Sequence, residues 1–431
     1  MSFDRARAIA NAVLLEGYVL YPYRASSRKN RFRWAFGVLA PKAWSEASAC
    51  EPWWMETQCL VEPEEDLRID LRLRFLQIQA RRVEVAGPDG AFSPAESLEV
   101  DGKLRIPWEE GEVTELPFEL RPSADGTWHQ ELAFSVPGER QEEPVADGSG
   151  AVAGRILRER LPVQGRILVE GERVDAERPL WRLRIRVENT TPWTTLDDPR
   201  DAALRGACVS SHLLLGASGG AFISVLDAPE WAAAAAKTCR STRCFPVLAG
   251  PPGERDLVLG SPIILYDHPQ VAPESPGDLC DACEIDEILT LRTLMLTDEE
   301  KRQARATDPR SAAIVDRAEA LAPEHWEKLH GALRDLHRAE MVPRQVAPAG
   351  LGRGSRVRLR PGSRRTDAQD LLFAGCIATV EAIVEDVDGR TYVAVTLDDD
   401  PAADMNRWYG RYHHYELDEV EPLTEAEART P

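Results

Sequence analysis

Apolar and polar residues alternate in several stretches of this chain, and this pattern constrains the fold more than any other feature. Residues 67–75 read LRIDLRLRF and residues 181–187 read WRLRIRV. Successive side chains of a β-strand point to opposite faces of its sheet, so a period of two predicts strands with one buried face. The alternation returns at residues 155–161 and 166–169. We therefore expect a mostly β chain, α+β overall, with strands dominating the first 265 residues.

Breaks in this alternation divide the chain into predicted domains. Residues 137–154 are rich in Pro, Gly, Asp and Glu and predict a seam between two sheet-rich, sandwich-like modules, at residues 1–145 and 146–295. The first module opens with a predicted short helix over residues 4–15, which Gly17 ends.

The pattern becomes helical after residue 278. Thr297 and, three residues later, Glu300 form the capping-box signature that opens a helix. A second helix is expected from Pro323, because apolar side chains recur there at spacings of three and four. Together these elements predict a helical hairpin at residues 296–345.

A separate C-terminal module is expected beyond the hairpin. Residues 346–354 contain the sequence APAGLGRG, which is typical of a flexible linker. Residues 355–431 hold five short alternating runs, with an Asp388-Gly389 pair suited to a hairpin turn. Five short strands in one small module predict an SH3-like barrel, followed by an acidic tail.

Charge and apolar content exclude several classes of partner. With 72 acidic against 52 basic side chains the formal net charge is −20, which disfavours nucleic acid and anionic membranes as partners. The longest apolar runs, such as Ile263–Tyr266, fall far short of the ~20 residues of a membrane helix. The N-terminus lacks the features of a signal peptide, so a cytoplasmic location is expected. No nucleotide or dinucleotide fingerprint occurs, and no cofactor is predicted.

Residues 216–220 read GASGG and match the G-x-S-x-G nucleophile elbow of serine hydrolases. Asp267 and His325 could complete a triad in the required order. An elbow must pass from a strand into a helix, however, whereas residues 221–226 have the composition of a second strand. We therefore interpret Ser218 as a residue of a glycine-rich turn, with a serine hydrolase as the alternative.

Two cysteine pairs could together bind a metal ion. Cys239 lies near Cys244, and Cys280 and Cys283 form a C-x-x-C; four thiolates can hold zinc tetrahedrally. The C-x4-C spacing is wide and neither pair sits in a recognisable zinc motif. Free thiols are the interpretation we prefer, with a metal-handling protein as the alternative.

The stretch from Tyr21 to Phe36 interleaves five basic residues with aromatic ones and contains no acid. In an acidic chain this indicates a surface for an acidic protein partner, because Arg and aromatic side chains dominate many interfaces. A single-stranded nucleic-acid groove and a solvated loop are the alternatives. The candidate partner-binding residues are Arg24, Arg28, Lys29, Arg31, Phe32, Arg33 and Trp34.

Three blocks of sequence carry a family resemblance: residues 15–41 (LEGYVLYPYRASSRKNRFRWAFGVLAP), residues within 261–301 (from SPIILYDHPQ to LMLTDEEK) and residues within 356–401 (from RVRLRP to VTLDDDP). They resemble a bacterial, mainly actinobacterial, family encoded beside nickel-iron hydrogenase genes, and the last block resembles a module of hydrogenase maturation proteins. That family often has Phe at the position of Cys280 and often lacks a cysteine at that of Cys244, which weakens the four-thiol site.

The resemblance carries no catalytic residues and implies a role in hydrogenase assembly. The sequence thus predicts a non-catalytic accessory or scaffold protein that works by protein–protein binding in nickel-iron hydrogenase assembly or maturation. A hydrogenase subunit or a maturation factor is the expected partner.

Overall fold

The computed structural model divides into two compact units, Met1–Ala332 and Leu333–Pro431. The residues that it describes are 3–27, 30, 33–122, 127–175, 178–271, 286–320, 351–360, 373, 375–385, 391–398 and 412–423. The helices are α1 (Asp4–Leu15), α2 (Lys42–Ser48), α3 (Arg200–Ala203), α4 (Ala233–Ala236), α5 (Asp286–Leu294), α6 (Asp298–Thr307) and α7 (Pro309–Glu319).

The strands confirm the prediction of a mostly β chain. Those of the first unit are β1 (Trp54–Ala86), β2 (Phe92–Pro94), β3 (Leu98–Val100), β4 (Lys103–Arg105), β5 (Trp108–Leu120), β6 (Trp128–Val136), β7 (Glu139–Ala146), β8 (Val152–Arg160), β9 (Val163–Arg173), β10 (Trp181–Asn189), β11 (Val209–Ile223), β12 (Phe245–Leu248) and β13 (Leu257–Ser261).

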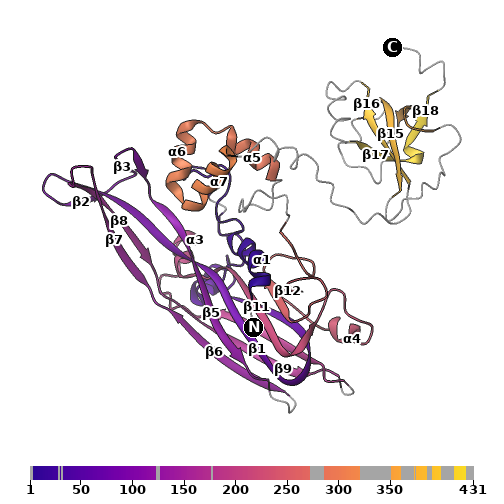
Figure 1. Cartoon of the computed structure of the whole chain (residues 1–431), viewed down its shortest axis with the longest axis horizontal. Helices are drawn as coiled ribbons and strands as arrows, with labels where there is room; N and C mark the ends of the chain where they lie inside the picture. Colours follow the sequence, from indigo (N-terminus) through magenta and orange to yellow (C-terminus); the bar gives the residue numbers. More distant parts are fainter. Residues whose placement is uncertain are drawn as a thin grey trace. The chain divides into compact units, whose positions relative to one another are not determined.

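Strand β1 is the spine of the first unit, because five other strands pair with it (Figure 1). Residues 60–61 of β1 pair with both β10 and β11, so these two strands lie on opposite edges. Further along, residues 69–76 pair with β5 and β11, and residues 79–81 pair with β5 and β8. One edge of β1 is therefore lined by β10 and then β5, and the other by β11 and then β8.

The predicted seam at residues 137–154 is wrong. Strands β7 and β8 occupy these residues and pair as an antiparallel hairpin, and β8 also pairs with β1. Strands from both predicted modules, 1–145 and 146–295, thus share one 11-stranded, curled antiparallel sheet.

The helices of the first unit begin and end where their sequences indicate. The predicted helix at residues 4–15 is confirmed as α1, which packs on β11 and β13 through Ala6 and Ala10. Helix α6 opens with the predicted capping box: the Thr297 hydroxyl accepts a hydrogen bond from the Glu300 amide, and the Glu300 side chain caps the Thr297 amide. Helix α7 follows at once, whereas the helix expected from Pro323 lies outside the described residues.

The second unit contains β14 (Arg356–Leu359), β15 (Ile377–Glu385), β16 (Thr391–Leu397), β17 (His413–Glu416) and β18 (Val420–Pro422). They form a five-stranded antiparallel sheet in the order β17-β16-β15-β14-β18. Its core includes Val357, Val380, Val395 and Tyr415. The predicted five strands are present, and the predicted Asp388-Gly389 turn lies outside the described residues.

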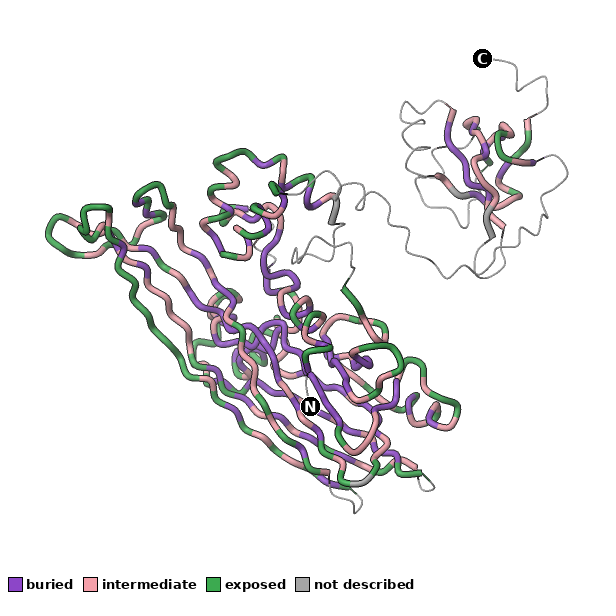
Figure 2. Tube along the Cα trace, viewed as in Figure 1, coloured by how far each residue is buried: buried purple, intermediate pink, exposed green. Residues whose placement is uncertain are grey.

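Burial separates the strands of the first unit into two kinds (Figure 2). β10 alternates as predicted, with Trp181, Leu183 and Ile185 buried and the arginines between them half-buried. β7 is exposed along almost its whole length, with Val145 its one buried residue. The main core therefore lies under the middle of the sheet, and the β7–β8 hairpin extends beyond it.

Candidate functional site

Arg33, predicted to face a partner, is instead buried inside the first unit. Its side chain is 5% exposed, and its guanidinium lies 3.9 Å from the centroid of the Trp108 ring and 4.4 Å from that of Trp34. It donates hydrogen bonds to the carbonyl oxygens of Tyr18 (2.6 Å) and Glu109 (2.7 Å). Burial lowers the pKa of Arg33 to about 10, so the guanidinium is still positively charged at pH 7. The aromatic rings next to it stabilise this cation.

Tyr18 continues this buried network to the helices. Its hydroxyl donates a 2.6 Å hydrogen bond to Oδ2 of Asp308 and accepts one from the Gly111 amide at 3.0 Å. Burial, followed by the charge of Asp308, raises the pKa of Tyr18 well above its ordinary value. Asp308 is itself the N-cap of α7, where it accepts from the Arg310 amide. The network thus attaches the α6–α7 pair to the sheet.

The other members of the predicted site fall into two groups. Trp34 is 7% exposed and belongs to the same core cluster as Tyr18, and Arg24 forms an ion pair with Glu300 of α6 at 2.6 Å. The remaining four predicted residues lie outside the described residues: Arg28, Lys29, Arg31 and Phe32. For Arg33 and Trp34 the prediction of a partner-binding surface is wrong, because both side chains are buried within the same chain: Arg33 contacts two aromatic rings and two carbonyl oxygens, and Trp34 packs against Tyr18.

A second buried cation lies beneath α1. Arg74 places Nε 3.0 Å from a carboxylate oxygen of Glu115, and its Nη2 donates to Asn11 at 2.6 Å. Its Nη1 lies 3.2 Å from Nε2 of His212, whose Nδ1 lies 2.9 Å from the Ser210 carbonyl. An arginine can only donate, so Nε2 accepts and Nδ1 carries the proton. Burial and the charge of Arg74 lower the pKa of His212 to about 3, so this histidine is neutral at pH 7.

Ser218 does not lie in a nucleophile elbow or in the predicted turn. It belongs to β11, which runs on to Ile223, and it pairs with Arg68 of β1. The sharp feature there is Gly219, with φ +73, opposite the register shift between Pro63 and Arg68. A glycine with positive φ, at an irregularity within a continuous strand, therefore explains the GASGG spacing. Asp267 is engaged elsewhere, and His325 lies outside the described residues.

The cysteines of the described ranges are free thiols. Cys244 is buried and Cys239 half-buried, and burial raises the pKa of Cys244 to about 12. Within these ranges no group of three or more His, Cys, Asp or Glu side chains is arranged to hold a metal ion. Cys280 and Cys283, the other half of the predicted four-thiol site, lie outside these ranges.

Two of the three most exposed large apolar side chains of the described residues lie on residues 262–268, which we call the Tyr266 segment; the third, Met295, follows α5. Tyr266 is 87% exposed and Ile264 is 76% exposed, while Leu265 between them packs against the cluster under α1. Leu226, 58% exposed, precedes Asp227 in a neighbouring loop. Large apolar side chains that stay in water on adjacent segments are typical of binding surfaces.

Hydrogen bonds fix the Tyr266 segment to its neighbours. Asp267 accepts from the Ser224 hydroxyl at 2.5 Å and from the Leu248 amide at 2.7 Å. His268, whose φ is +54, donates its amide to the Leu248 carbonyl at 2.7 Å. The Ser224 hydroxyl in turn accepts from the amides that follow Val225, so it joins the two loops. These hydrogen bonds hold the backbone around Tyr266 in one conformation, so less conformational entropy is lost when a partner binds.

The sequence contained one signal for this segment. Ile263–Tyr266 is among the longest apolar runs of the chain, and such a run ordinarily predicts a buried strand. Here the strand β13 ends at Ser261, just before the run, so alternate side chains of the run face water.

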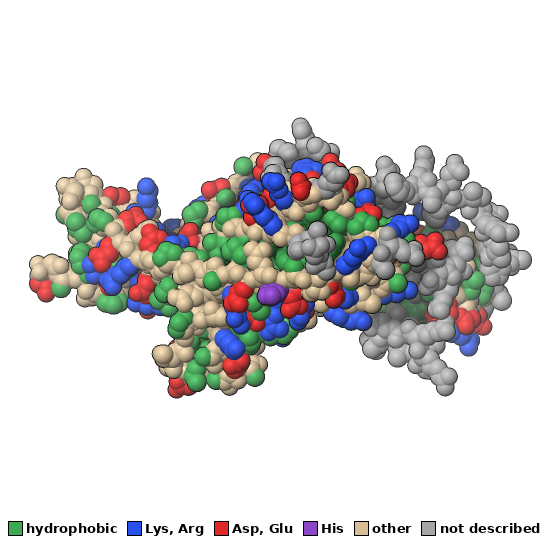
Figure 3. Space-filling view, turned by 90° about the horizontal axis from the view of Figure 1, so that it is seen from below, with side chains coloured by type: hydrophobic (Ala, Val, Ile, Leu, Met, Phe, Trp, Pro, Cys, Tyr) green, Lys and Arg blue, Asp and Glu red, His purple; other side chains and the backbone are tan. Residues whose placement is uncertain are grey.

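No protein-family model matches this chain, and a search of the curated proteins finds no similar sequence. Among the described residues, no helix is both long and apolar enough to cross a membrane. On the face seen in Figure 3, acidic and basic side chains are interspersed with apolar ones.

Proposed function

We propose that this protein is a non-catalytic accessory or scaffold protein that acts in nickel-iron hydrogenase assembly or maturation by binding a protein partner. The observation that carries the binding role is the Tyr266 segment, with Tyr266 at 87% and Ile264 at 76% exposure on a hydrogen-bonded support. The hydrogenase context comes from the family resemblance of the sequence. In this proposal the partner is a hydrogenase subunit or a maturation factor.

The size of the exposed side chains supports a useful binding energy. Covering a large apolar or aromatic side chain contributes about 1.5–3 kcal/mol before the costs of association. Tyrosine is also enriched among the few residues that dominate an interface. A partner with a shallow apolar recess would therefore gain most of its contact energy here.

Two finer features belong to the same proposal. The second unit would be an SH3-like barrel, an interpretation that its five short antiparallel strands support. The protein would work in the cytoplasm, where free cysteines such as Cys50, Cys59 and Cys208 stay reduced.

The test is a quantitative capture experiment. The tagged full-length chain is expressed in a host that makes a nickel-iron hydrogenase, and captured proteins are measured by mass spectrometry. We expect hydrogenase subunits or maturation factors to be enriched, and this enrichment to fall at least tenfold for the double variant Ile264→Ser with Tyr266→Ser. The matched control is Leu196→Ser, which removes an apolar side chain 47% exposed elsewhere.

Both variants alter exposed side chains, so their thermal midpoints should match that of the parent chain closely. Equal capture by the parent and the double variant would remove the Tyr266 segment from the proposal. Capture without any hydrogenase protein would remove the hydrogenase context.

A further inference from the structure

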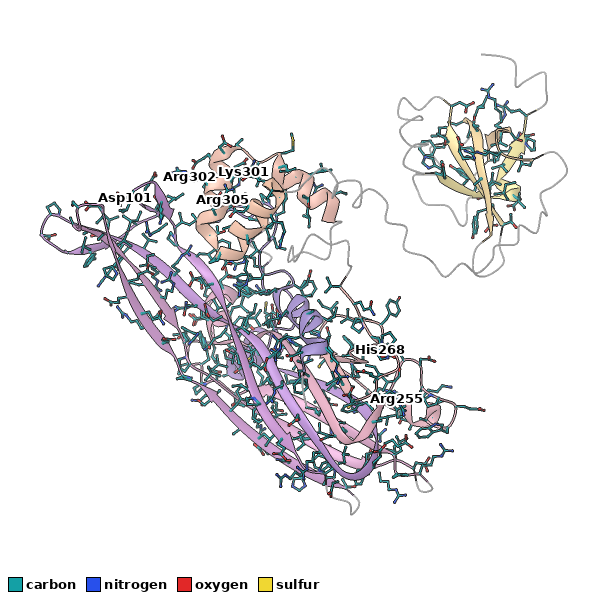
Figure 4. All side chains as sticks on the ribbon, in the orientation of Figure 1. Asp101, Arg255, His268, Lys301, Arg302 and Arg305 are labelled. Atoms are coloured by element: carbon teal, nitrogen blue, oxygen red, sulfur yellow. The ribbon has the colours of Figure 1, made fainter. Side chains whose placement is uncertain are left out.

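A pocket of about 440 Å³ lies between the β3–β4 hairpin and helix α6 of the first unit. Four of its seven lining residues are basic and none is acidic, in a chain whose formal net charge is −20. We call it the basic pocket, lined by Gly102, Lys103, Leu104, Arg105, Arg302, Arg305 and Ala306. Figure 4 shows Lys301, Arg302 and Arg305 on α6 beside the hairpin turn that carries Asp101.

Both walls of the basic pocket are anchored in the fold. Asp101 and Gly102, with φ of +51 and +73, form the tight turn of the hairpin. Leu98 and Val100 of β3 pack into a core cluster of the sheet. On the other wall, Arg81 donates hydrogen bonds of 2.7 Å to the carbonyl oxygens of Ala306 and Thr307 at the end of α6. The cations are therefore displayed at fixed positions.

The cations of the two walls differ in their existing partners. Arg302 forms ion pairs with Glu99 and Glu299, and Arg305 pairs with Asp316 and Glu319. Lys103 and Arg105 form no ion pair within the described part of the chain, where Arg105 donates only to the Lys103 carbonyl. The unneutralised positive charge of the pocket thus comes from the hairpin.

The neighbouring acid of the hairpin turn does not supply the missing partner. The Asp101 carboxylate lies 3.8 Å from the position that a Cβ on Gly148 would take, so it faces the β7–β8 turn. Lys103 is exposed and Arg105 half-buried. A negatively charged ligand could therefore reach both of them.

We infer that the basic pocket binds an extended acidic segment of a protein partner, with carboxylates at alternate positions. Lys103 and Arg105 are two residues apart on one strand, so they share a face and are separated by roughly 6.6–7 Å. Alternate carboxylates of an extended peptide have the same separation. Ala306 supplies apolar lining for the carbon atoms of such a segment. A compact anion such as phosphate would not span the two cations.

This inference rests on the proposed function only in taking the ligand to be part of a protein. The basic pocket and the Tyr266 segment are built from different residues and can be tested separately. In Figure 4, His268 and Arg255 lie far from the α6 cluster within the same unit. Arg255 is exposed, which makes it a matched control for charge reversal.

The experiment measures fluorescence anisotropy of a labelled peptide of five Glu-Ser repeats with the full-length chain. We expect saturable binding that weakens as salt rises from 50 to 300 mM, because exposed charges are increasingly screened. The double variant Lys103→Glu with Arg105→Glu should bind at least tenfold more weakly, and Arg255→Glu should bind as the parent does. The Ile264→Ser with Tyr266→Ser variant should also retain the peptide.

The inference would be overturned by no binding of the peptide at millimolar protein, by equal binding of the Lys103→Glu with Arg105→Glu variant, or by displacement by inorganic phosphate at matched ionic strength. The last result would identify the pocket as a small-anion site. Retained peptide binding together with failure of the capture experiment would reject the proposed function while leaving this inference standing. Loss of peptide binding by both Arg255→Glu and the hairpin variant would show attraction to overall charge and would also overturn it.

Discussion

Replacing Tyr18 with Phe removes one buried hydroxyl and tests whether the network beneath α7 stabilises the first unit. The change leaves Oδ2 of Asp308 without its 2.6 Å donor and the Gly111 amide without its 3.0 Å acceptor. A hydrogen bond to a charged group contributes about 1.5–3 kcal/mol, and an orphaned buried amide costs about 1–3 kcal/mol. Because the ring remains and no large cavity forms, we expect a loss of about 3 kcal/mol in the free energy of unfolding.

The expected shift in thermal midpoint follows from the size of the unit. Unfolding entropy is about 2.1 cal/mol/K per residue, which over the 332 residues of Met1–Ala332 amounts to about 0.7 kcal/mol/K. The loss of about 3 kcal/mol should therefore lower Tm by about 4 °C, measured by circular dichroism, and lower the urea midpoint in parallel. Tyr266→Phe removes a hydroxyl from a side chain 87% exposed and should leave both midpoints unchanged. Equal midpoints for Tyr18→Phe and the parent chain would refute the claim that this hydroxyl stabilises the fold.

Two further predictions concern His212 and Ser218. The folded-state pKa of His212 is about 3, against about 6.5 in the unfolded chain. As pH falls, the unfolded state therefore binds the proton first. The free energy of unfolding is highest above pH 6.5 and decreases as pH falls toward 3. Between pH 8 and pH 5 the decrease due to His212 is about 2 kcal/mol. In urea titrations over this range, the His212→Gln variant should therefore lose about 2 kcal/mol less stability than the parent chain. An identical pH dependence of the two proteins would contradict the assignment. For Ser218, a fluorophosphonate probe should leave the intact protein unlabelled, because Ser218 lies within β11 and no helix follows it as in a nucleophile elbow. Labelling that disappears in Ser218→Ala would restore the hydrolase alternative.

Sequence patterns predicted the elements whose signals are local. The helix at residues 4–15 and the capping box at Thr297 depend on neighbours within one turn, and both are present. The alternation at residues 181–187 likewise located β10 and its buried face. In each case the residues that specify the element are also the residues that form it.

The remaining features depend on contacts between distant residues. β7 is a polar strand with hardly any buried face, so its sequence resembles a linker. The sequence around Arg33 predicts a surface charge, but in the fold the guanidinium is covered by Trp108, 75 residues away in the chain. The basic pocket likewise joins Lys103 to Arg302 across 199 positions, a pairing that no local pattern can predict.

The length of β1 has a consequence for co-translational folding of the chain. Residues 60–76 of β1 find their partner on one edge only in β11, which ends at Ile223. Until about 150 further residues have been synthesised, that edge carries a row of unpaired amide and carbonyl groups, the kind of template on which chains aggregate. The N-terminal half of this protein therefore cannot complete its sheet during its own synthesis, and a holding chaperone would act most usefully before Ile223 emerges.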